Sequence, residues 1–554
     1  MKYVVVTGGV ISGLGKGITT SSLARMFKAR GVTVTPLKID PYLNVDAGTM
    51  NPYQHGEVFV LDDGTEVDLD LGNYERFLGE SLAGNHNITT GKVYRSVIDK
   101  ERRGDYLGNT VQIIPHITGE VKRMIREVGE SSGAEVGLIE VGGTVGDIES
   151  MPFLEALREM RQEVGRHEDM AFVHTTLIPV VGAVGEAKTK PTQHSVRELR
   201  SLGIQPDMIV ARSSQPISSD IKAKISLFCG VPTEAVISVP DMSCIYDIPL
   251  HLEKEGVGDY LMRRLGLTPR SSEWTSWKGF VERYHAAKGE VNVGIVGKYA
   301  ELKDAYLSHS EALHHCQGSL GVKVMLNWFD SEPISNPSQP LGLLEKVDAV
   351  LVPGGYGKRG IEGKIRAIQM AREKGLPMLG ICLGFQLAAV EVARHILNLA
   401  DANSSEFDPA TTHPVVDLLK EQGKVVDMGG TQHLGAQKVL LTEGSAIAAL
   451  YGRTEILERH RHRYEINREY LPQFEQKGFK ATGFSPDGRV EALELQGHPY
   501  FMGVQYHPEF LSRPESPHPL YMGLLQAAIT RMAVLNPDAS RSSSSTGGVA
   551  PVSP

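Results

Sequence analysis

The sequence predicts an α/β protein of two domains, each with a mainly parallel sheet flanked by helices. A chain of 554 residues is too long for one hydrophobic core, so at least two domains are expected. Short apolar runs, such as 3–7, 136–141 and 349–352, alternate with segments of helical period, the order typical of parallel strands joined by helices. Glycine-rich turns follow several of these runs. Ligands are therefore expected at the carboxyl edges of the strands.

Changes in composition predict where the domains begin and end. The first domain is expected to cover 1–266, and a linker that contains two tryptophans is expected at 267–288. A fresh apolar run opens the second domain, which is predicted over 289–535. The tail, 536–554, combines a serine run with Gly-Gly and late prolines. It is predicted to be disordered, because it has little apolar surface to bury.

The bulk composition argues against several classes of protein. A net charge of −9 and a pI of about 6.1 are unlike those of a general nucleic-acid binder. No apolar run approaches the roughly 20 residues of a membrane helix, and the N-terminus enters a strand without a basic and apolar leader. The cysteines show no paired metal-type spacing, which indicates a reducing compartment. The expected location is the cytoplasm, without nucleic-acid or membrane partners.

The strongest chemical signal lies in the second domain. Cys382 stands between glycines where a short apolar run meets a helical segment, which is the setting of a nucleophile elbow. The N-terminus of such a helix offers backbone N–H groups to an oxyanion. Downstream, His507-Pro508-Glu509 puts an imidazole and a carboxylate on the same side of an extended segment. With the glycine-rich turn 353–357, these residues predict a Cys-His-Glu catalytic site.

These motifs resemble the class I glutamine amidotransferases, in which a cysteine attacks the side-chain amide of glutamine and releases ammonia. The resemblance implies that Cys382 is the nucleophile, His507 the base and Glu509 the partner of the base. It also implies a set of residues that contact glutamine or the oxyanion: Gly355, Leu383, Gly384, Phe385, Gln386, Glu406 and Arg463. A carboxylate and a guanidinium suit the α-ammonium and α-carboxylate of glutamine, which need partners when buried.

A second glycine-rich loop follows the first apolar run of the chain. This loop, 8–17, leads from a predicted strand into a helix, an arrangement in which backbone N–H groups and a lysine bind phosphate. The N-terminal domain is therefore expected to be of the Rossmann type and P-loop-like. Gly17 departs from the standard motif, because a serine or threonine normally follows the lysine. Either Thr19 or Thr20 could supply the missing hydroxyl.

Further charged residues end other predicted strands of the N-terminal domain. Lys38 follows an apolar run, Asp70 alternates with leucines, and Glu140 ends the buried run 136–141. Carboxylate oxygens are the ligands that Mg²⁺ prefers when it also holds ATP phosphates. Taken alone, each of these acids could equally be a solvated surface group.

Five motifs, taken in order, resemble those of the CTP synthases: 6–17, 38–42, 68–77, 140–150 and 188–195. The resemblance runs from Met1 to about Leu535. It implies an amidoligase domain joined to a glutaminase domain. Such an enzyme phosphorylates the 4-oxygen of UTP with ATP and lets ammonia, from glutamine or from solution, displace the phosphate to form CTP.

The same resemblance implies the positions of the nucleotide sites. ATP is expected at Gly13, Leu14, Gly15, Lys16, Gly17, Ile18, Lys38 and Asp70. Magnesium is expected with ATP at Asp70 and Glu140, and no organic prosthetic group is expected. UTP or CTP is expected at Ser12, Asp147, Ile148, Glu149, Lys188, Thr189, Lys190, Pro191, Thr192, Gln193 and Lys224. Activation by GTP, inhibition by CTP and a homotetramer are also implied.

Two other classes of function fit parts of the sequence. Deviant glycine loops also occur in ATPases that act as nucleotide switches, although a switch has no use for the Cys382, His507 and Glu509 set. A structural role in filaments is the second class, and it would add to catalysis rather than replace it.

Overall fold

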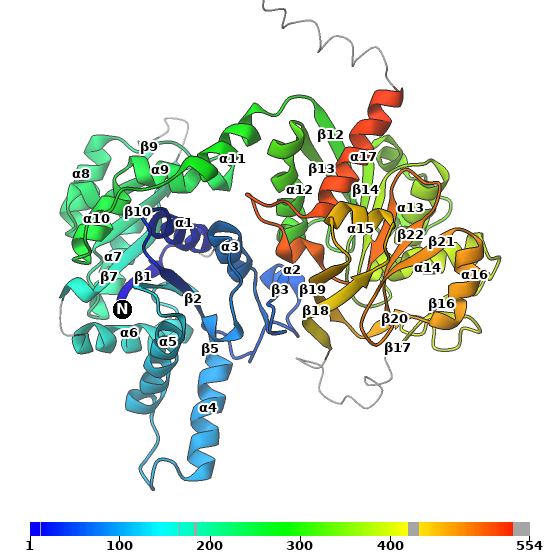
Figure 1. Ribbon diagram of the computed structural model, residues 1–554. Helices are drawn as coiled ribbons and strands as arrows, with labels where there is room; N and C mark the ends of the chain where they lie inside the picture. Colours follow the sequence, from blue (N-terminus) through cyan, green and yellow to red (C-terminus); the bar gives the residue numbers. More distant parts are fainter. Residues whose placement is uncertain (12, 165–166, 182–185, 419–431, 536–554) are drawn as a thin grey trace, which may run out of the picture. The chain divides into compact units, whose positions relative to one another are not determined.

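The computed structural model describes residues 1–11, 13–164, 167–181, 186–418 and 432–535. Ser12 and the predicted tail at 536–554 lie outside these ranges. The contacts divide the chain into two compact units. Unit 1 is Met1–Gly48 with Glu66–Val281, and unit 2 is Thr49–Thr65 with the chain from Glu282 onward (Figure 1). The predicted domain limits at 266 and 289 remain a proposal, and no pattern in the sequence indicates that 49–65 belongs with unit 2.

Unit 1 is built on a seven-stranded sheet in which every neighbouring pair is parallel. Its order is β11 (Val236–Pro240), β10 (Met208–Ser213), β7 (Met170–Leu177), β1 (Lys2–Gly8), β6 (Val136–Val141), β2 (Val34–Asp40) and β5 (Asn87–Thr89). The central strands are buried along nearly their whole length, because helices cover both faces of a parallel sheet.

Two layers of helices cover this sheet. On one face, Tyr3 and Val5 share a hydrophobic cluster with α4 (Thr90–Arg103), α5 (Thr118–Ser132), α6 (Met151–Glu163) and α7 (Lys190–Ser201). Elsewhere α1 (Lys16–Ala29) packs with α3 (Leu69–Leu78), α9 (Ile248–Lys254) and α10 (Val257–Arg264). The remaining helices of this part are α8 (Ser219–Cys229) and α11 (Thr275–Ala286), in which the division between the units falls. Trp277, from the predicted linker, is fully buried beside Phe77 and Tyr246 of unit 1.

Unit 2 contains a nine-stranded mixed sheet. Its parallel part is β13 (Lys323–Asp330), β12 (Glu290–Gly297), β14 (Ala349–Val352), β15 (Met378–Ile381) and β23 (Phe501–Val504). Its antiparallel part is β22 (Val490–Leu495), β21 (Phe479–Phe484), β18 (His433–Leu441) and β19 (Glu455–His462). A small sheet adds β16 (Asn403–Ser404), β17 (Pro414–Leu418) and β20 (Tyr464–Ile466).

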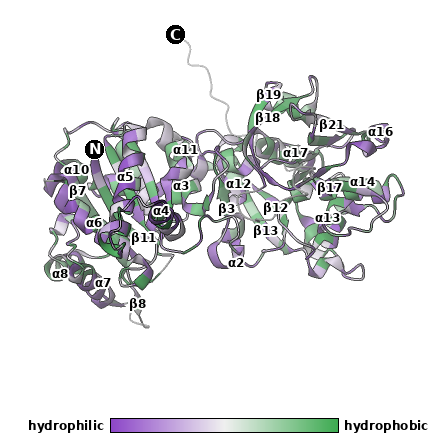
Figure 2. Ribbon diagram, turned by 90° about the horizontal axis from the view of Figure 1, so that it is seen from below, coloured by the Kyte–Doolittle hydropathy of each residue, from purple (hydrophilic) through white to green (hydrophobic). Residues whose placement is uncertain are grey.

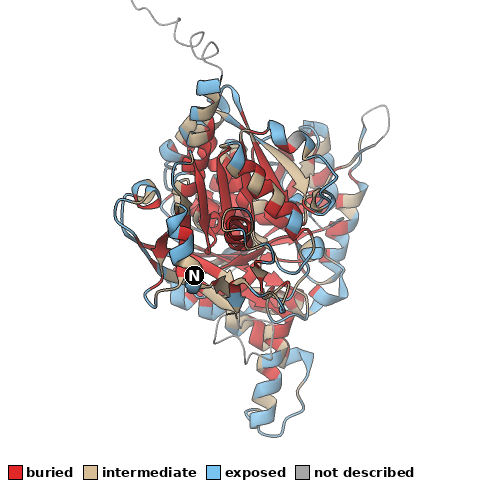
Figure 3. Ribbon diagram, turned by 90° about the vertical axis from the view of Figure 1, so that its right-hand side faces the viewer, coloured by how far each residue is buried: buried red, intermediate tan, exposed pale blue. Residues whose placement is uncertain are grey.

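The strands of unit 2 alternate between two hydrophobic clusters. Val350 and Val352 of β14 face one cluster with α13 (Ile361–Glu373) and α14 (Leu383–His395), whereas Ala349 and Leu351 face the other. The second cluster includes α12 (Leu307–Leu320), α15 (Ala446–Tyr451) and α17 (Pro519–Leu535). The remaining short helix of this part is α16 (Leu471–Gln476). The parallel strands β12, β14, β15 and β23 are largely apolar and buried, whereas β13, β18 and β19 include exposed positions (Figures 2 and 3).

The segment 49–65 is a separate stretch of chain that completes unit 2. It contains α2 (Pro52–His55) and β3 (Val58–Val60). Glu57 accepts hydrogen bonds from the backbone and hydroxyl of Ser308, at 3.1 and 2.5 Å. Phe59 packs edge-on against Phe510, with ring centroids 4.8 Å apart.

The predicted fold class, α/β with mainly parallel sheets in two domains, is confirmed. None of the described helices combines the length and apolar character that a membrane crossing requires.

Candidate active sites

Cys382 lies in a sharp turn between β15 and α14 of unit 2. Its backbone has φ 52° and ψ −103°, a region that residues with a side chain adopt at a cost of about 1–3 kcal/mol. The glycines on either side permit the turn. A Cβ at Gly384 would lie 1.9 Å from the Val352 carbonyl oxygen, and one at Gly380 would lie 2.8 Å from the backbone of Gly384. The turn therefore has the form of the predicted nucleophile elbow.

His507 and Glu509 are joined by a buried hydrogen bond of 2.6 Å between Nδ1 and Oε1. The other ring nitrogen is left for Cys382, whose Cβ and Sγ border the same space above Gly354 as His507 Cε1. Burial alone would lower the pKa of His507, but the charges of Glu509 and Cys382 raise it to about 10. The three side chains form a nucleophile, a base and an orienting carboxylate.

A histidine that the sequence did not indicate lies behind the carboxylate. His309 Nε2 is 3.4 Å from Glu509 Oε1, and His309 Nδ1 is 2.7 Å from the Tyr521 hydroxyl. Burial would raise the pKa of Glu509, but His309 and His507 together lower it. Glu509 is thus held in its ionised form between two imidazoles.

Two lysines support the glycine-rich turn beside the nucleophile. Lys364 is fully buried in α13 and donates to the carbonyl oxygens of Pro353, at 2.6 Å, and Gly354, at 3.2 Å. Lys298 donates to the carbonyl oxygens of Tyr356, at 2.8 Å, and Gly357. These hydrogen bonds hold the carbonyl oxygens of the turn, so its N–H groups do not have to compete with them for an oxyanion.

Other predicted glutamine contacts come from three different elements. Leu383, Gly384 and Phe385 form the first turn of α14, and Gly355 has a φ of 143°. Glu406 accepts a 3.0 Å hydrogen bond from the Gly357 N–H group. Glu406 and Arg463 both lie near Tyr464. Burial is the main cause that raises the pKa of the Tyr464 phenol; Glu406 raises it further, and Arg463 opposes the rise.

Gln386 is tied into the site through a second glutamine. Gln386 Nε2 donates to the Tyr464 carbonyl oxygen at 2.9 Å and to Gln505 Oε1 at 3.1 Å. Gln505 Nε2 lies 3.7 Å from Cys382 Sγ. The sequence analysis missed Gln505, although its place two residues before His507 puts it on the same side of an extended segment.

In unit 1, the glycine-rich loop joins β1 to α1 as predicted. Gly13 and Gly15 have φ values of 70° and 86°, which glycine adopts at low cost. Lys16 lies over Gly8, where a Cβ would come within 2.6 Å of its Cδ, and donates to the Gly143 carbonyl oxygen at 2.7 Å. Burial lowers the pKa of Lys16, a shift that Lys38 increases and nearby carboxylates oppose. Leu14 is buried and Ile18 is half-buried beside the loop.

The carboxylate of Asp70 explains why Gly17 follows the lysine. A Cβ at Gly17 would lie 1.8 Å from Asp70 Oδ1, so any other residue would have to displace the Asp70 carboxylate. The two candidate hydroxyls bond to their own helix, Thr19 to the Gly15 carbonyl oxygen at 2.9 Å and Thr20 to that of Lys16 at 3.0 Å. In a standard P-loop, a serine or threonine hydroxyl lies beside the lysine; here the Asp70 carboxylate lies next to Gly17, at the position after Lys16.

Four carboxylates surround the buried ammonium of Lys38. Asp70 is hydrogen-bonded to it, and the nearest oxygens of Glu140, Asp68 and Asp40 lie at 3.4, 3.5 and 3.6 Å. Strand register makes part of this arrangement, because Lys38 of β2 pairs with Glu140 of β6.

The acidic cluster fits a divalent cation. Burial raises the pKa values of Asp68 and Glu140, and that of Asp40 to about 7, while Lys38 opposes each rise. The negative charge therefore exceeds what Lys38 balances. Asp70 and Glu140 supply hard oxygen donors beside Lys16, which suits Mg²⁺ bound with phosphates.

The residues predicted to bind UTP or CTP lie in three places. Asp147, Ile148 and Glu149 are exposed after β6, and the Asp147 carboxylate accepts a 2.7 Å bond from the Thr144 N–H group. The second place is the segment that leads into α7 together with the first residues of that helix: Lys188, Thr189, Lys190, Pro191, Thr192 and Gln193. The third is Lys224 on α8, which together with Lys188 lowers the pKa of Glu186.

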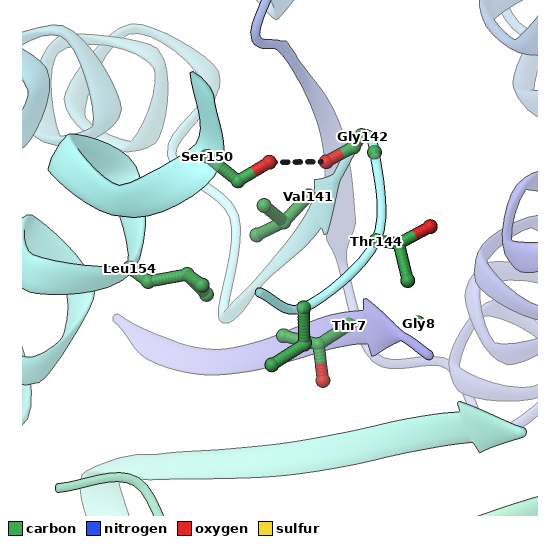
Figure 4. Close-up of a pocket in the computed structure, with 9 residues that line it drawn as sticks. Thr7, Gly8, Val141, Gly142, Thr144, Ser150 and Leu154 are labelled. Carbon is green, nitrogen blue, oxygen red and sulfur yellow. Dashed lines mark hydrogen bonds between the residues drawn. The ribbon is translucent and has the colours of Figure 1, made fainter. Parts of the chain in front are cut away.

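A buried hydrogen-bond chain links the glycine loop to α7. Thr7 Oγ1 lies 2.9 Å from His174 Nδ1, and His174 Nε2 lies 2.8 Å from Ser195 Oγ. Burial, with a smaller contribution from Lys16, lowers the pKa of His174 to about 3, so the imidazole is neutral. A small pocket opens beside Thr7 at the carboxyl ends of β1 and β6, where Ser150 donates to the Gly142 carbonyl oxygen (Figure 4).

Comparison with known proteins agrees with this geometry. Residues 2–267 match the family model for the CTP synthase N-terminus, and residues 301–527 match that for class I glutamine amidotransferase. A CTP synthase of Methanopyrus kandleri is 58% identical over 95% of this chain and 99% of its own length. A CTP synthase of Thermococcus kodakarensis is 56% identical over 95% and 98%. A solved glutaminase domain of Trypanosoma brucei CTPS with bound acivicin is 36% identical, covers 43% of this chain and 94% of its own, and has a TM-score of 0.41. The chain belongs to the CTP synthase family.

Proposed function

We propose that this chain converts UTP to CTP at the expense of ATP, with nitrogen taken from glutamine or from free ammonia. The observation that carries the proposal is the presence, in one chain of this family, of two chemically different sites. The Cys382 site is arranged to release ammonia from an amide. The Lys16 and Lys38 site is arranged to hold phosphates, and ammonia made at the first needs a second site to consume it.

In unit 1, phosphoryl transfer calls for positioning and positive charge rather than for a protein nucleophile. Backbone N–H groups of the glycine loop and Lys16 bind the phosphates of ATP, and Lys38 stabilises the transferred group. Asp70 and Glu140 would hold Mg²⁺, which would neutralise charge on the phosphate oxygens. The phosphate is transferred to the 4-oxygen of UTP, because that oxygen is otherwise a poor leaving group.

In unit 2, Cys382 attacks the side-chain amide of glutamine while His507 donates a proton to the leaving ammonia. The oxyanion is bound by the N–H groups of Gly355 and Leu383, and the resulting glutamyl thioester is hydrolysed by water that His507 activates. Glu406 and Arg463 bind the α-ammonium and α-carboxylate of the substrate. The ammonia must remain unprotonated until it meets the uracil ring, because ammonium has no lone pair.

The proposal includes regulation and assembly. CTP inhibits by occupying the pocket that binds UTP, GTP activates glutamine hydrolysis, and the enzyme is a homotetramer. Exposed apolar side chains in unit 1 support assembly: Ile98 on α4, and Leu107, Ile113 and Ile114 after it, are 55, 91, 44 and 51% exposed. Apolar groups gathered on an extension of this kind are typical of a surface that another subunit covers.

The test separates the two half-reactions by chromatography of the nucleotide products. With UTP, ATP and Mg²⁺, the wild-type protein is expected to form CTP from glutamine or from ammonium at raised pH. Cys382→Ala is expected to lose the glutamine-dependent reaction and keep the ammonia-dependent one, whereas Lys16→Ala loses both. Wild-type protein that forms no CTP from either source contradicts the proposal, and so does folded Cys382→Ala that has also lost the ammonia reaction.

A further inference from the structure

Three histidines gather at one edge of the large sheet of unit 2, and the mechanism above uses none of them. His433 begins β18 and pairs across the antiparallel register with His462, the last residue of β19. His460 stands two residues earlier on β19 and therefore shares a face with His462. The three ring centroids are 5.1–5.4 Å from one another. One nitrogen from each ring lies within 4.8 Å of the other two.

The nitrogens of this cluster, His433–His460–His462, are set as metal ligands are. His462 Nδ1 lies 3.0 Å from the Tyr464 carbonyl oxygen, so it donates its hydrogen there and leaves a lone pair on Nε2. Such a bond from the second ring nitrogen is typical of metal-binding histidines. His460 Nδ1 is 3.2 Å from His462 Nε2. Two nitrogens bound at about 2.0–2.1 Å to one tetrahedral ion lie roughly 3.3 Å apart.

Charge and burial around the cluster also favour a cation. His460 and His462 are both buried, so a cation held between their rings would be shielded from water. His460 Nε2 is buried without a hydrogen-bond partner. Beside the cluster, Glu491 Oε2 lies 3.6 Å from His460 Nδ1 and is likewise buried without a hydrogen bond. Arg489, which lies near enough to affect Glu491, already pairs with Asp487 at 3.0 Å.

We propose that His433, His460 and His462 bind one divalent transition-metal ion of the zinc class. Neutral imidazoles are the ligands that such ions prefer over Mg²⁺, which takes oxygen donors. Glu491 or water completes the coordination. His433 is only half-buried, so the ion reaches the cluster from its side.

The metal site is coupled to glutamine hydrolysis through the backbone of β19. The Arg459 carbonyl oxygen accepts a 2.8 Å hydrogen bond from the His507 N–H group, and the Arg461 carbonyl oxygen lies 3.6 Å from Cys382 Sγ. These two carbonyls flank His460 in the chain. An ion that fixes His460 and His462 therefore fixes the backbone against which the nucleophile and base are set. This coupling rests on the proposed glutaminase activity, whereas metal binding does not.

Metal binding is tested by counting the ions on the full-length protein. Chelator-treated protein is dialysed against Zn²⁺ with excess Mg²⁺, and bound zinc is measured by mass spectrometry. Wild-type protein is expected to retain one equivalent more than His433→Gln or His462→Gln. His413→Gln, a half-exposed histidine elsewhere in unit 2, and Cys382→Ser are expected to retain it. Equal zinc content in wild-type and His433→Gln protein overturns the site, as does loss of the ion in Cys382→Ser.

Cobalt provides a second readout that does not depend on activity. Co²⁺ in the cluster is expected to give the strong visible bands of a tetrahedral site, without a sulfur charge-transfer band, and His433→Gln is expected to lose them. Wild-type spectra that match free aqueous Co²⁺ contradict the proposal. Unchanged circular dichroism in His433→Gln establishes that the variant is folded.

The coupling is tested by glutamine hydrolysis with and without Zn²⁺. Added zinc is expected to change the wild-type rate of glutamate release by several-fold and to leave His433→Gln unchanged, with ammonia-dependent CTP formation constant in both. If zinc binds but does not change the rate of glutamate release, the coupling is overturned. A protein that binds zinc but never forms CTP instead refutes the proposed function and leaves the metal site intact.

Discussion

The two active sites balance their charges differently. In unit 2, Cys382, His507 and Glu509 interact with one another, and His309 adds a further contact to the carboxylate. In unit 1, four carboxylates surround Lys38, and Lys16 is a second cation that acts on Asp70 and Glu140. The first site is complete in the protein alone. In the second, the carboxylates outnumber the one ammonium that they surround, so a bound cation would be needed to balance them.

The largest expected effect tests the packing of Gly17 against Asp70. Gly17→Ser should abolish CTP formation from both glutamine and ammonia, because the new Cβ would lie 1.8 Å from Asp70 Oδ1 and would displace that carboxylate from Lys38. Glutamine hydrolysis itself should persist. Gly119→Ser is the matched control, because a Cβ on that helical glycine meets no atom within 4 Å. If Gly17→Ser synthesises CTP at the wild-type rate, Asp70 does not hold the position assigned to it.

The next effect concerns the base in unit 2. Glu509→Gln removes the charge that contributes most to raising the pKa of His507, so the alkaline limb of glutamine hydrolysis should move to lower pH. The rate near neutral pH should fall by about 10²–10⁴-fold. Ammonia-dependent synthesis should be unaffected. Glu458→Gln, which alters a different buried carboxylate–histidine pair 3.0 Å apart, is the control and should leave the limb in place. An unmoved limb in Glu509→Gln would refute the assignment.

A smaller effect is expected from the lysine under the oxyanion turn. Lys364→Met removes the two hydrogen bonds to the Pro353 and Gly354 carbonyl oxygens. Its glutamine-dependent kcat should fall by about tenfold, with a smaller change in KM, because the turn loses its fixed geometry at the oxyanion. Lys374→Met alters a more exposed lysine at the end of the same helix and serves as the control. Equal losses with glutamine and ammonia would show a general folding defect instead.

The smallest expected effect is on the thermal stability of the protein. It tests whether the carboxylates around Lys38 in unit 1 carry more negative charge than that lysine balances. The pKa of Asp40 rises from its usual 3.8 to about 7 on folding, chiefly through burial. The folded state thus keeps this proton when the unfolded state has lost it, and stability falls as pH rises from about 4 to 7. Asp40→Asn should flatten this decline in calorimetry, raising Tm at pH 7 by about 2–4 °C. Asp99→Asn, on an exposed helix face, should change nothing. A wild-type Tm that rises over this range would contradict the surplus.

The sequence predicted the parts of each site that are carried by short local patterns. The turn around Cys382 and the loop before Lys16 are fixed by glycines within a few residues, so motif and geometry coincide. Lys364 and His309 could not be predicted in this way. In a helical segment, a single lysine or histidine cannot be told from a surface residue by its sequence pattern. Its role depends on residues far away in the sequence that pack around it in the fold.

Other features were hidden for the same physical reason. The close approach of Asp70 to Gly17 comes from the packing of α3 against α1. The histidine cluster joins His433 to residues across an antiparallel register that no local period reveals. Patterns in one sequence therefore predict individual helices, strands and turns well. They do not predict which residues, far apart in the sequence, come together in a site.

The excursion of 49–65 into unit 2 bears on how this protein can be divided by genetic engineering. Asp62 of that segment accepts a 2.6 Å ion-pair contact from Arg459, which is fully buried and whose carbonyl oxygen holds the backbone of His507. A glutaminase expressed from about residue 282 alone would lack this partner and the contacts of Glu57 and Phe59. The two domains that carry the activities are thus not independent segments of sequence joined by a linker. Recombination or gene splitting at the obvious junction would remove part of one catalytic core along with the other.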